Sequence, residues 1–271
     1  MRIADRVAVV TGGASGIGRA VVRQLAREDI RAVGVVDVSE VVFDFCREVN
    51  EEFGRNFAYP YRGDVSDRAF RREVFDAMRS AHGPVHICIP GAGIVRDGLA
   101  VKIDRATGKA QLYDQDLFER TVAINLIAPV YWAMEAVASV AEDRAARGLG
   151  RWSPVEDVQG AVVFIGSISS AGNKGQVSYA STKAGLEGAQ STLAKEAIFY
   201  GVRCAIIHPG FTDTPMVRAM DQRIIEEFVL PQTQLRRLLR ADEIADAICF
   251  LIRNSAVSGA LWADAGWHPP A

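Results

Sequence analysis

The chain has 271 residues, of which 49% are hydrophobic and 24% are charged, a composition typical of a globular protein. Its 31 basic and 33 acidic residues give a formal net charge of −2. That balance provides no electrostatic case for binding nucleic acid or an anionic membrane, so we expect neither as a partner. The cysteines are scattered without a CxxC pair, which favours buried reduced thiols over disulfides or a zinc site: Cys46, Cys88, Cys204 and Cys249.

Targeting and membrane signals are not evident along the chain. The first apolar run, residues 7–10, is too short for the core of a signal peptide. The longest apolar stretches also fall far below the length needed to span a bilayer. We therefore expect a protein of the reducing cytoplasm.

Short apolar runs rich in β-branched residues alternate with longer amphipathic segments. The runs, which we expect to be buried parallel strands, are residues 7–10, 32–36, 57–61, 85–89, 161–165, 204–207 and 260–263. The helices expected between them cover residues 17–29, 39–53, 67–82, 116–147, 178–200 and 241–253. This alternation predicts an α/β fold, with a doubly wound parallel sheet of about seven strands and helices on both faces. No repeat or linker divides the chain, so residues 1–271 are expected to form a single dinucleotide-binding catalytic domain.

Three segments interrupt the alternation. Residues 95–115 carry charges and a Thr-Gly turn, and are expected to form a loop or small hairpin. Residues 143–158 extend a helix end into a basic loop. Residues 211–240 contain Pro215 and Pro231 and are expected to cover the substrate site.

A glycine-rich turn follows directly on the first expected strand and opens the first helix. It reads Thr11-Gly12-Gly-Ala-Ser15-Gly16-Ile17-Gly18. Glycines allow a sharp turn and a close approach of the backbone, and the free N–H groups of a helix N-terminus favour an anion such as a pyrophosphate. The strand–turn–helix context predicts a dinucleotide site rather than a structural turn.

Acidic residues close the next two strands. Asp37 lies nineteen residues after Gly18, where a carboxylate can accept hydrogen bonds from both adenosine ribose hydroxyls and repel a 2′-phosphate, which favours NAD over NADP. Asp64 and Val65 follow the third strand and could contact the adenine. Both acidic positions would also suit helix caps.

Tyr179 and Lys183 stand four residues apart in an expected helix, so the phenol and the ammonium share one face. A nearby cation favours the phenolate, and lowering a tyrosine pKa by roughly three units requires about 4 kcal/mol. A close lysine together with the positive ring of an oxidised cofactor could supply that energy. The pair therefore indicates acid/base chemistry beside a nucleotide.

In these motifs the chain resembles the classical short-chain dehydrogenase/reductase family, over residues 5–268, and within it the 3-oxoacyl-thioester reductases through the stretch 93–99. The resemblance implies a Rossmann-type fold and a catalytic tetrad of Asn125, Ser167, Tyr179 and Lys183. It also implies cofactor contacts at Gly12, Ser15, Gly16, Ile17, Gly18, Asp37, Asp64, Val65, Ala92, Gly93, Tyr179, Lys183, Pro209, Gly210, Thr212 and Thr214.

The mechanism that the resemblance implies is reversible hydride transfer between a nicotinamide and an alcohol or ketone carbon. Tyr179 would be the general acid/base, and Lys183 would lower its pKa and hold the nicotinamide ribose. Ser167 would donate a hydrogen bond to the substrate oxygen. Asn125 would support a water chain, or would simply be a mid-helix polar residue bonded to a neighbouring strand.

The chain departs from the family pattern at two places. The usual Asn-Asn-Ala-Gly after the fourth strand reads Pro90-Gly-Ala-Gly here. The interval from Ser167 to Tyr179 is one residue shorter than the commonest spacing, which makes Ser169 and Ser170 rivals of Ser167.

Other polar residues receive structural interpretations. His208 is expected to be a structural histidine at a strand end. His82, His86 and His268 have no ligand spacing, so no metal is expected. Two arginine groups could solvate their segments or bind an anionic substrate: Arg144, Arg147 and Arg151, and Arg236, Arg237 and Arg240.

The leading hypothesis is an NAD-dependent short-chain alcohol dehydrogenase or ketone reductase (EC 1.1.1.-). One alternative is a 3-oxoacyl-thioester reductase acting on acyl carrier protein or CoA substrates, which Asp37 disfavours where NADPH is expected. A second is a non-catalytic nucleotide sensor, against which the intact Ser-Tyr-Lys set argues.

The resemblance also implies a homo-oligomer, a dimer or a homotetramer. Its seams would involve helices 116–147 and 178–200 and the C-terminal segment 259–270, where Trp262 and Trp267 lie.

Overall fold

Seven parallel strands form one continuous sheet in the computed structural model, which describes residues 1–267. The order across the sheet is β3-β2-β1-β4-β7-β8-β9, so the chain begins near the middle and winds outward in both directions. This confirms the predicted doubly wound α/β fold. The strands are β1 (Val7–Thr11), β2 (Ala32–Asp37), β3 (Ala58–Arg62), β4 (Ile87–Pro90), β7 (Gly160–Ile165), β8 (Val202–Pro209) and β9 (Gly259–Ala263).

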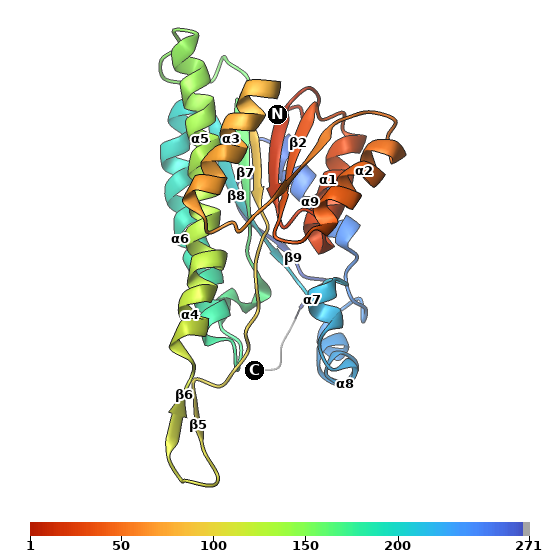
Figure 1. Ribbon diagram of the computed structural model, residues 1–271, viewed down its shortest axis with the longest axis vertical. Helices are drawn as coiled ribbons and strands as arrows, with labels where there is room; N and C mark the ends of the chain where they lie inside the picture. The colour runs from red at the N-terminus through yellow and green to blue at the C-terminus, as the bar shows by residue number, and fades with distance from the viewer. Residues whose placement is uncertain (268–271) are drawn as a thin grey trace.

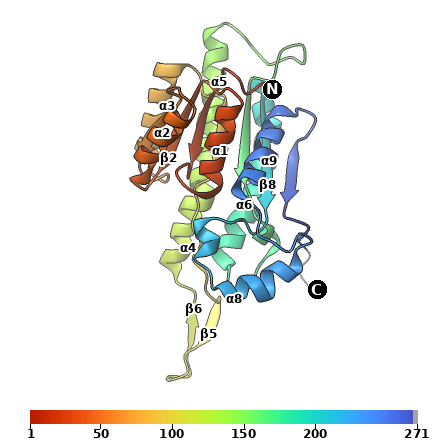
Figure 2. The same cartoon turned by 90° about the vertical axis from the view of Figure 1, so that its right-hand side faces the viewer.

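Helices cover both faces of the sheet (Figures 1 and 2). One face carries α1 (Gly16–Arg27), α2 (Val41–Glu52) and α9 (Ala241–Arg253). The other face carries α3 (Arg68–His82), α5 (Ala128–Ala146) and α6 (Val177–Glu196). The predicted helices agree with these bounds to within a few residues.

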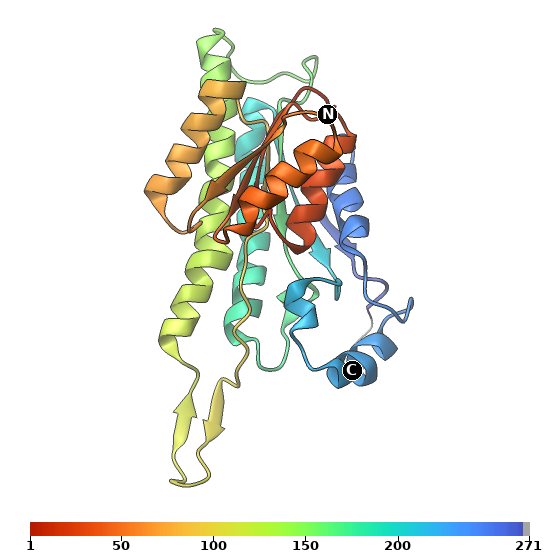
Figure 3. The same ribbon diagram turned by 45° about the vertical axis from the view of Figure 1, so that its right-hand side comes forward.

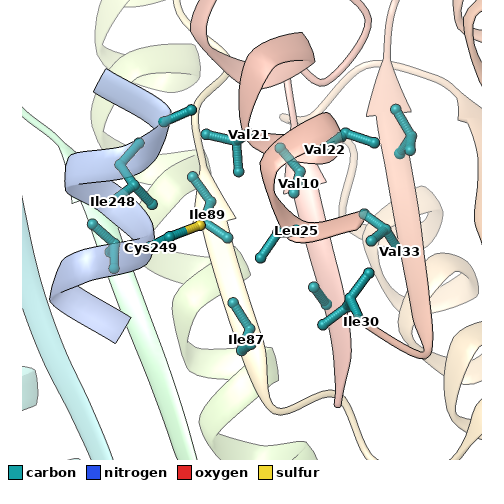
Figure 4. Close-up of a cluster of buried hydrophobic side chains, with 14 of the residues drawn as sticks. Val10, Val21, Val22, Leu25, Ile30, Val33, Ile87, Ile89, Ile248 and Cys249 are labelled. Atoms are coloured by element: carbon teal, nitrogen blue, oxygen red, sulfur yellow. The ribbon is translucent and has the colours of Figure 1, made fainter. Parts of the chain in front are cut away.

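The strands are apolar at every position because both of their faces are buried. In β1, Val10 packs among the residues under α1 and α9, whereas the adjacent Val9 belongs to the cluster under α3, α5 and α6. Figure 4 shows the first of these layers, in which Leu25 of α1 and Ile248 of α9 face Ile89 of β4. Two dry layers therefore hold the strand ends at fixed positions, and the candidate site lies at their carboxyl edge.

The helix predicted over 116–147 is divided by a π-helical turn. It consists of α4 (Gln115–Val122), the π turn η1 (Ala123–Ile127) and α5. Such insertions are common at functional sites, and this one contains Asn125. The helix predicted over residues 116–147 is confirmed as one helical run, Gln115–Ala146, and only the π turn within it was not predicted.

The expectation about apolar stretches also needs correction. The helical run Gln115–Ala146 has 32 residues and an 18-residue window of mean hydropathy 1.4, which by length and composition alone is enough to cross a membrane. In this structure one side of the run packs on the sheet through the buried Trp132, Ala133 and Ala136. The core helix of a globular domain passes the same test, so the signal is weak.

Residues 95–115 form the small hairpin that was expected. Strands β5 (Val101–Ile103) and β6 (Ala110–Leu112) pair antiparallel and project from the carboxyl edge of the sheet (Figures 1 and 3). The base of the hairpin is fixed near α6, because the Gly98 N–H donates to the Gly175 carbonyl at 2.8 Å. The Tyr113 hydroxyl also lies 3.1 Å from the Ser178 hydroxyl.

Residues 211–240 contain only short helical pieces near the carboxyl edge (Figure 3). These are α7 (Pro215–Arg218), α8 (Gln222–Ile224), the π turn η4 (Ile225–Val229) and the 3-10 turn η5 (Leu230–Gln232). Two further 3-10 turns are η2 (Ile168–Ala171) and η3 (Ala197–Tyr200). The expected loop after α5 occupies residues 147–159.

Several arginines that could have bound an anionic substrate are paired with carboxylates. Arg144 is 1% exposed and lies 2.6 Å from a Glu156 oxygen, while Arg237 and Arg240 pair with Glu243 and Asp242. A buried arginine whose charge is already matched is a structural element. An anion-binding role for Arg144 is therefore wrong.

Candidate active site

The glycine turn between β1 and α1 is built for close backbone approach. Gly12 has φ +66°, and a Cβ there would lie 3.0 Å from the backbone of Ala92 in the neighbouring loop. A Cβ on Gly18 would lie 2.2 Å from the Gly12 carbonyl oxygen. Both positions therefore require glycine, and the turn is packed tightly against the strand β4 loop.

The N-terminus of α1 has its backbone donors available for a ligand. Ser15 is the N-cap residue, and within residues 1–267 its side chain makes no capping hydrogen bond to the helix. Gly16, with φ +48°, faces Thr214 from the 211–240 segment, since a Cβ on Gly16 would lie 3.1 Å from the threonine methyl. Uncapped N–H groups and the helix dipole suit a phosphate, so these residues fit a dinucleotide.

Asp37 lies against the glycine turn. One carboxylate oxygen accepts the Ala14 N–H at 3.1 Å, and the other accepts the Ser39 N–H at 3.1 Å. Asp37 thus caps the turn that follows β2 through Ser39 and also contacts the glycine turn through Ala14. Each oxygen keeps a further lone pair for a ligand hydroxyl.

Basic side chains around Asp37 are matched by acids. Arg19 lies 2.7 Å from Glu48, and Arg62, which pairs in register with Asp37, lies 2.9 Å from Glu40. Each of these arginines therefore has a carboxylate partner at the surface.

Asp64 and Val65 follow β3. The Asp64 carboxylate accepts from the backbone and hydroxyl of Ser66, and these bonds lower the pKa of Asp64. The helix cap is Asp67 instead, which accepts from the Ala69 N–H at 2.7 Å. Val65 is buried, and its carbonyl accepts from the Trp132 indole at 2.9 Å. Asp64 is exposed at the same edge of the sheet as the glycine turn.

The loop after β4 is held by hydrogen bonds to Thr11. The Thr11 carbonyl accepts from the Gly91 N–H at 3.1 Å, and its hydroxyl accepts from the Ala92 N–H at 3.1 Å. Gly93 lies beside Asn125, because a Cβ there would be 3.4 Å from its side-chain oxygen.

Asn125 is fully buried and makes a paired contact with the main chain of Ile94. Its amide oxygen accepts the Ile94 N–H and its amide nitrogen donates to the Ile94 carbonyl, both at 2.8 Å. The side chain therefore fixes the loop that follows β4. This contact matches the second of the two expectations for Asn125, a polar helix residue bonded to a neighbouring strand segment.

Tyr179 and Lys183 lie on one face of α6, as predicted, with the Lys183 nitrogen 5.5 Å from the centre of the Tyr179 ring. Lys183 is 6% exposed and donates to the Ile165 carbonyl at the end of β7, at 2.7 Å. Burial lowers the pKa of Lys183 to about 8. An ammonium this well buried is costly, and it persists at functional sites more readily than in structural cores.

The pKa of Tyr179 is raised in this structure, chiefly by burial, while the Ser167 side chain opposes the rise and Asp97 adds to it. This direction is opposite to the lowering that base chemistry requires. The protein side chains alone therefore do not provide the lowering expected from the sequence.

Ser167 is the serine next to Tyr179. It is 8% exposed, and its hydroxyl oxygen accepts from the Ser169 N–H at 3.0 Å. Ser170 instead donates its hydroxyl to the Ser167 carbonyl at 2.8 Å. The geometry thus gives Ser169 and Ser170 supporting positions around Ser167.

The segment after β8 completes the edge. A Cβ on Gly210 would lie 2.8 Å from the Asp264 carbonyl oxygen, and the Gly210 N–H donates to Ala263 at 2.9 Å. Thr212 is buried and donates to the Gly210 carbonyl. Pro209 is buried at the strand end, and Thr214 reaches the glycine turn.

One edge of the sheet therefore brings together the glycine turn, the Ser167-Tyr179-Lys183 group and the Gly210–Thr214 segment. A profile of the short chain dehydrogenase family matches residues 6–224. The chain belongs to the short-chain dehydrogenase family. It is an oxidoreductase of that family, with relatives of the 3-oxoacyl reductase kind.

Individual relatives cover nearly the whole chain. It is 28% identical over 259 residues to a (3R)-3-hydroxyacyl-CoA dehydrogenase of Canis lupus familiaris, covering 93% of this chain and 90% of the relative. It is 29% identical to the 3-oxoacyl-[acyl-carrier-protein] reductase FabG of Escherichia coli K12, with 94% and 93% covered. The crystal structure of gox2181 superimposes with a TM-score of 0.81 at 25% identity, covering 98% of this chain and 96% of that one.

His208 lies at the end of β8, where a structural histidine was expected. His208 is fully buried, and its Nδ1 lies 3.2 Å from the Ser167 backbone nitrogen. Its place directly before Pro209-Gly210 at a strand end was the signal in the sequence. His268 lies outside the described residues, and among residues 1–267 no cluster of three or more His, Cys, Asp or Glu side chains could hold a metal.

Replacing Lys183 by methionine is expected to stabilise the fold. At about 1.4 kcal/mol per pKa unit, burying this ammonium costs about 3 kcal/mol, and its bond to Ile165 returns about 1 kcal/mol. Lys183→Met should therefore raise the free energy of unfolding by about 2 kcal/mol below pH 8.

The gain should shrink as the pH rises from about 8 to 10.5, because the unfolded lysine binds more protons than the folded one across that window. Urea denaturation at several pH values measures it, with the exposed Lys195→Met as control. A destabilised Lys183→Met protein would contradict this energy balance.

Proposed function

We propose that the protein is an NAD-dependent oxidoreductase that transfers a hydride between the nicotinamide and a secondary alcohol or ketone. The observation that carries the proposal is the meeting of Tyr179, Lys183 and Ser167 at the sheet edge beside the glycine turn. The nicotinamide, when bound, supplies or accepts the hydride. All other steps depend on protein groups that hold the substrate and move its proton.

Tyr179 is the proposed general acid/base, because it is half-buried with a hydroxyl beside Ser167. Ser167 accepts a hydrogen bond from Ser169, so its own proton is left to donate to a substrate oxygen that gains charge. Lys183 holds a positive charge one helical turn from Tyr179 and suits the ribose hydroxyls. Asn125 keeps the loop after β4 in place for this arrangement.

The cofactor contacts proposed are the backbone of Gly12 to Gly18, the Asp37 carboxylate, Asp64-Val65, Ala92-Gly93 and the segment Pro209 to Thr214. Asp37 supports NAD over NADP because its carboxylate contacts the glycine turn, where it would repel a 2′-phosphate. The nearby Arg19 and Arg62 are paired with Glu48 and Glu40. Residues 211–240 would cover the substrate. Their exposed Met216 and Phe228 favour an apolar substrate body.

A second candidate is a 3-oxoacyl-thioester reductase, and the relatives named above support it. The hairpin gives this candidate a structural argument as well. It projects beside the site with Val101, Ile103 and Leu112 exposed, a surface that could extend along an acyl or pantetheine chain. The intact Ser-Tyr-Lys group argues against the non-catalytic sensor.

We further propose a homo-oligomer of the reducing cytoplasm. Ile127, Tyr131 and Met134 form an exposed apolar stripe on the outer side of the η1–α5 helix at helical spacing. Trp262 is 51% exposed, and Trp267 contacts the Phe211 ring at 5.2 Å. The four buried thiols suit a reducing compartment.

The cofactor preference is testable by substitution. Asp37→Ala should weaken NADH binding about 10- to 100-fold, because hydrogen bonds to a charged group are worth about 1.5–3 kcal/mol. It should also reduce the ratio of NADH affinity to NADPH affinity. Fluorescence titration of both nucleotides measures this, with the exposed Asp44→Ala as the matched control. Tighter NADPH than NADH binding by the unmodified chain would contradict the proposal.

The substrate class is tested by comparing specificity constants with NADH. A general ketone reductase should have kcat/KM values for simple ketones within about tenfold of its kcat/KM for acetoacetyl-CoA, since each of these substrates presents a ketone carbonyl to the site. A preference for the thioester exceeding about 100-fold would replace the leading proposal by the second candidate.

The oligomer is tested by sedimentation of the purified chain. The double variant Tyr131→Glu, Met134→Glu should be monomeric, because two charges would have to be buried in the seam. Val155→Glu, at a 94% exposed loop position, should keep the oligomer. A monomeric wild-type protein at micromolar concentration would refute the proposed seam.

A further inference from the structure

His208 lies against the backbone of Ser167. It is fully buried at the end of β8, under Gly166, where a Cβ would lie 2.6 Å from its Nδ1 atom. Its ring stacks on Trp262 of the adjacent strand at 4.2 Å between centroids and 15° between planes. The ring therefore has little freedom to move.

The Nδ1 atom of His208 meets three groups from the Ser167 turn. It lies 3.2 Å from the Ser167 N–H, 3.1 Å from the Ser167 carbonyl oxygen and 3.3 Å from the Ser170 hydroxyl. Ser170 already donates to that carbonyl at 2.8 Å. A protonated Nδ1 would donate to the Ser167 carbonyl but would leave the Ser167 N–H facing another donor. An unprotonated Nδ1 accepts that N–H, and the carbonyl keeps the hydrogen bond from Ser170.

The opposite nitrogen has a carboxylate within reach. His208 Nε2 is buried without a hydrogen-bond partner within residues 1–267, and the Glu187 carboxylate is 3.7 Å away. Glu187 is half-exposed, so a small rotation of its side chain can bring an acceptor to this nitrogen. A buried N–H left unpaired costs about 1–3 kcal/mol, which favours that contact.

Glu187 continues the row of functional residues on α6. Tyr179, Lys183 and Glu187 are spaced by four residues and share one face of the helix. Lys183 reaches the end of β7 at Ile165, and Glu187 reaches the end of β8 at His208. The two strand ends that flank Ser167 are thus both engaged by one helix face.

Resting on the proposed function, we propose that His208 is a positioning residue for Ser167, held by Glu187 as the neutral Nε2–H tautomer. In this arrangement His208 accepts the Ser167 N–H, Ser169 donates to the Ser167 hydroxyl oxygen, and the hydroxyl proton points toward the substrate. Burial, the largest effect, and the charge of Lys183 lower the pKa of His208, and they outweigh the Ser167 carbonyl and Glu187, both of which favour an imidazolium.

The tautomer can be read without substrate or cofactor. Long-range proton–nitrogen correlation spectra of the full chain labelled with ¹⁵N-histidine report which ring nitrogen carries the proton, and His208→Asn assigns the signal by its loss. We expect the Nε2–H form throughout the pH range in which an ordinary histidine titrates. An Nδ1–H form or an imidazolium at neutral pH would overturn the proposal.

Glu187 supplies a matched pair of variants. Glu187→Gln keeps an acceptor oxygen and should keep the tautomer and kcat, whereas Glu187→Leu should populate the Nδ1–H form and lower kcat on the order of tenfold at unchanged NADH affinity. Glu196→Leu, an exposed carboxylate of the same helix, should change neither. Equal kcat values for the glutamine and leucine variants would overturn the positioning role.

The two proposals fail in different ways. If the unmodified chain reduces no ketone or thioester with NADH, the proposed function fails while the spectra still decide the tautomer. If the chain is active but Glu187→Leu has the kcat and the His208 tautomer of the unmodified chain, the proposed function is upheld and the His208–Glu187 pair has no positioning role.

Discussion

A buried ammonium is the constraint on which the arrangement of this site depends. Lys183 bonds to the carbonyl at the end of β7 and lies 5.5 Å from the centre of the Tyr179 ring, so one cation joins the strand end to the tyrosine. The charge is expensive because the surroundings are apolar, as its lowered pKa shows. The helix therefore sacrifices stability at this edge of the sheet, where the proposed chemistry would use a fixed cation.

The sheet makes that constraint effective by presenting several strand ends at one level. Parallel strands with both faces buried cannot slide, because each side chain is committed to one of two dry layers. The turns after β1, β4, β7 and β8 therefore occur side by side, and contacts such as Gly12 against Ala92 leave no room for larger residues. Close backbone packing at this edge places the proposed phosphate site beside the proposed proton-transfer site.

Much of this was accessible from the sequence. Periodicity located the seven strands and the major helices, and the hairpin at residues 95–115 followed from its charged turn. The spacing of Tyr179 and Lys183 predicted their shared face. These features depend on local patterns, in which one residue constrains its neighbours a few positions away.

Features that depend on distant contacts were missed. The π turn contains Asn125, whose paired bonds go to Ile94, thirty-one residues away. The burial of Arg144 depends on Glu156, and the role of His208 depends on Ser167, forty-one residues away, and on Glu187. Neither propensity nor spacing encodes such tertiary pairing. The raised pKa of Tyr179 likewise reflects burial, which a helical spacing cannot reveal.

The most direct test of the central claim is the turnover of Tyr179→Phe with NADH and a ketone that the unmodified chain reduces. Loss of a proton donor that acts in the transition state should lower kcat by about 10²- to 10⁴-fold, while NADH binding measured by fluorescence stays unchanged. Turnover within about tenfold of the unmodified chain would show that the proton moves through another group, and would contradict the account.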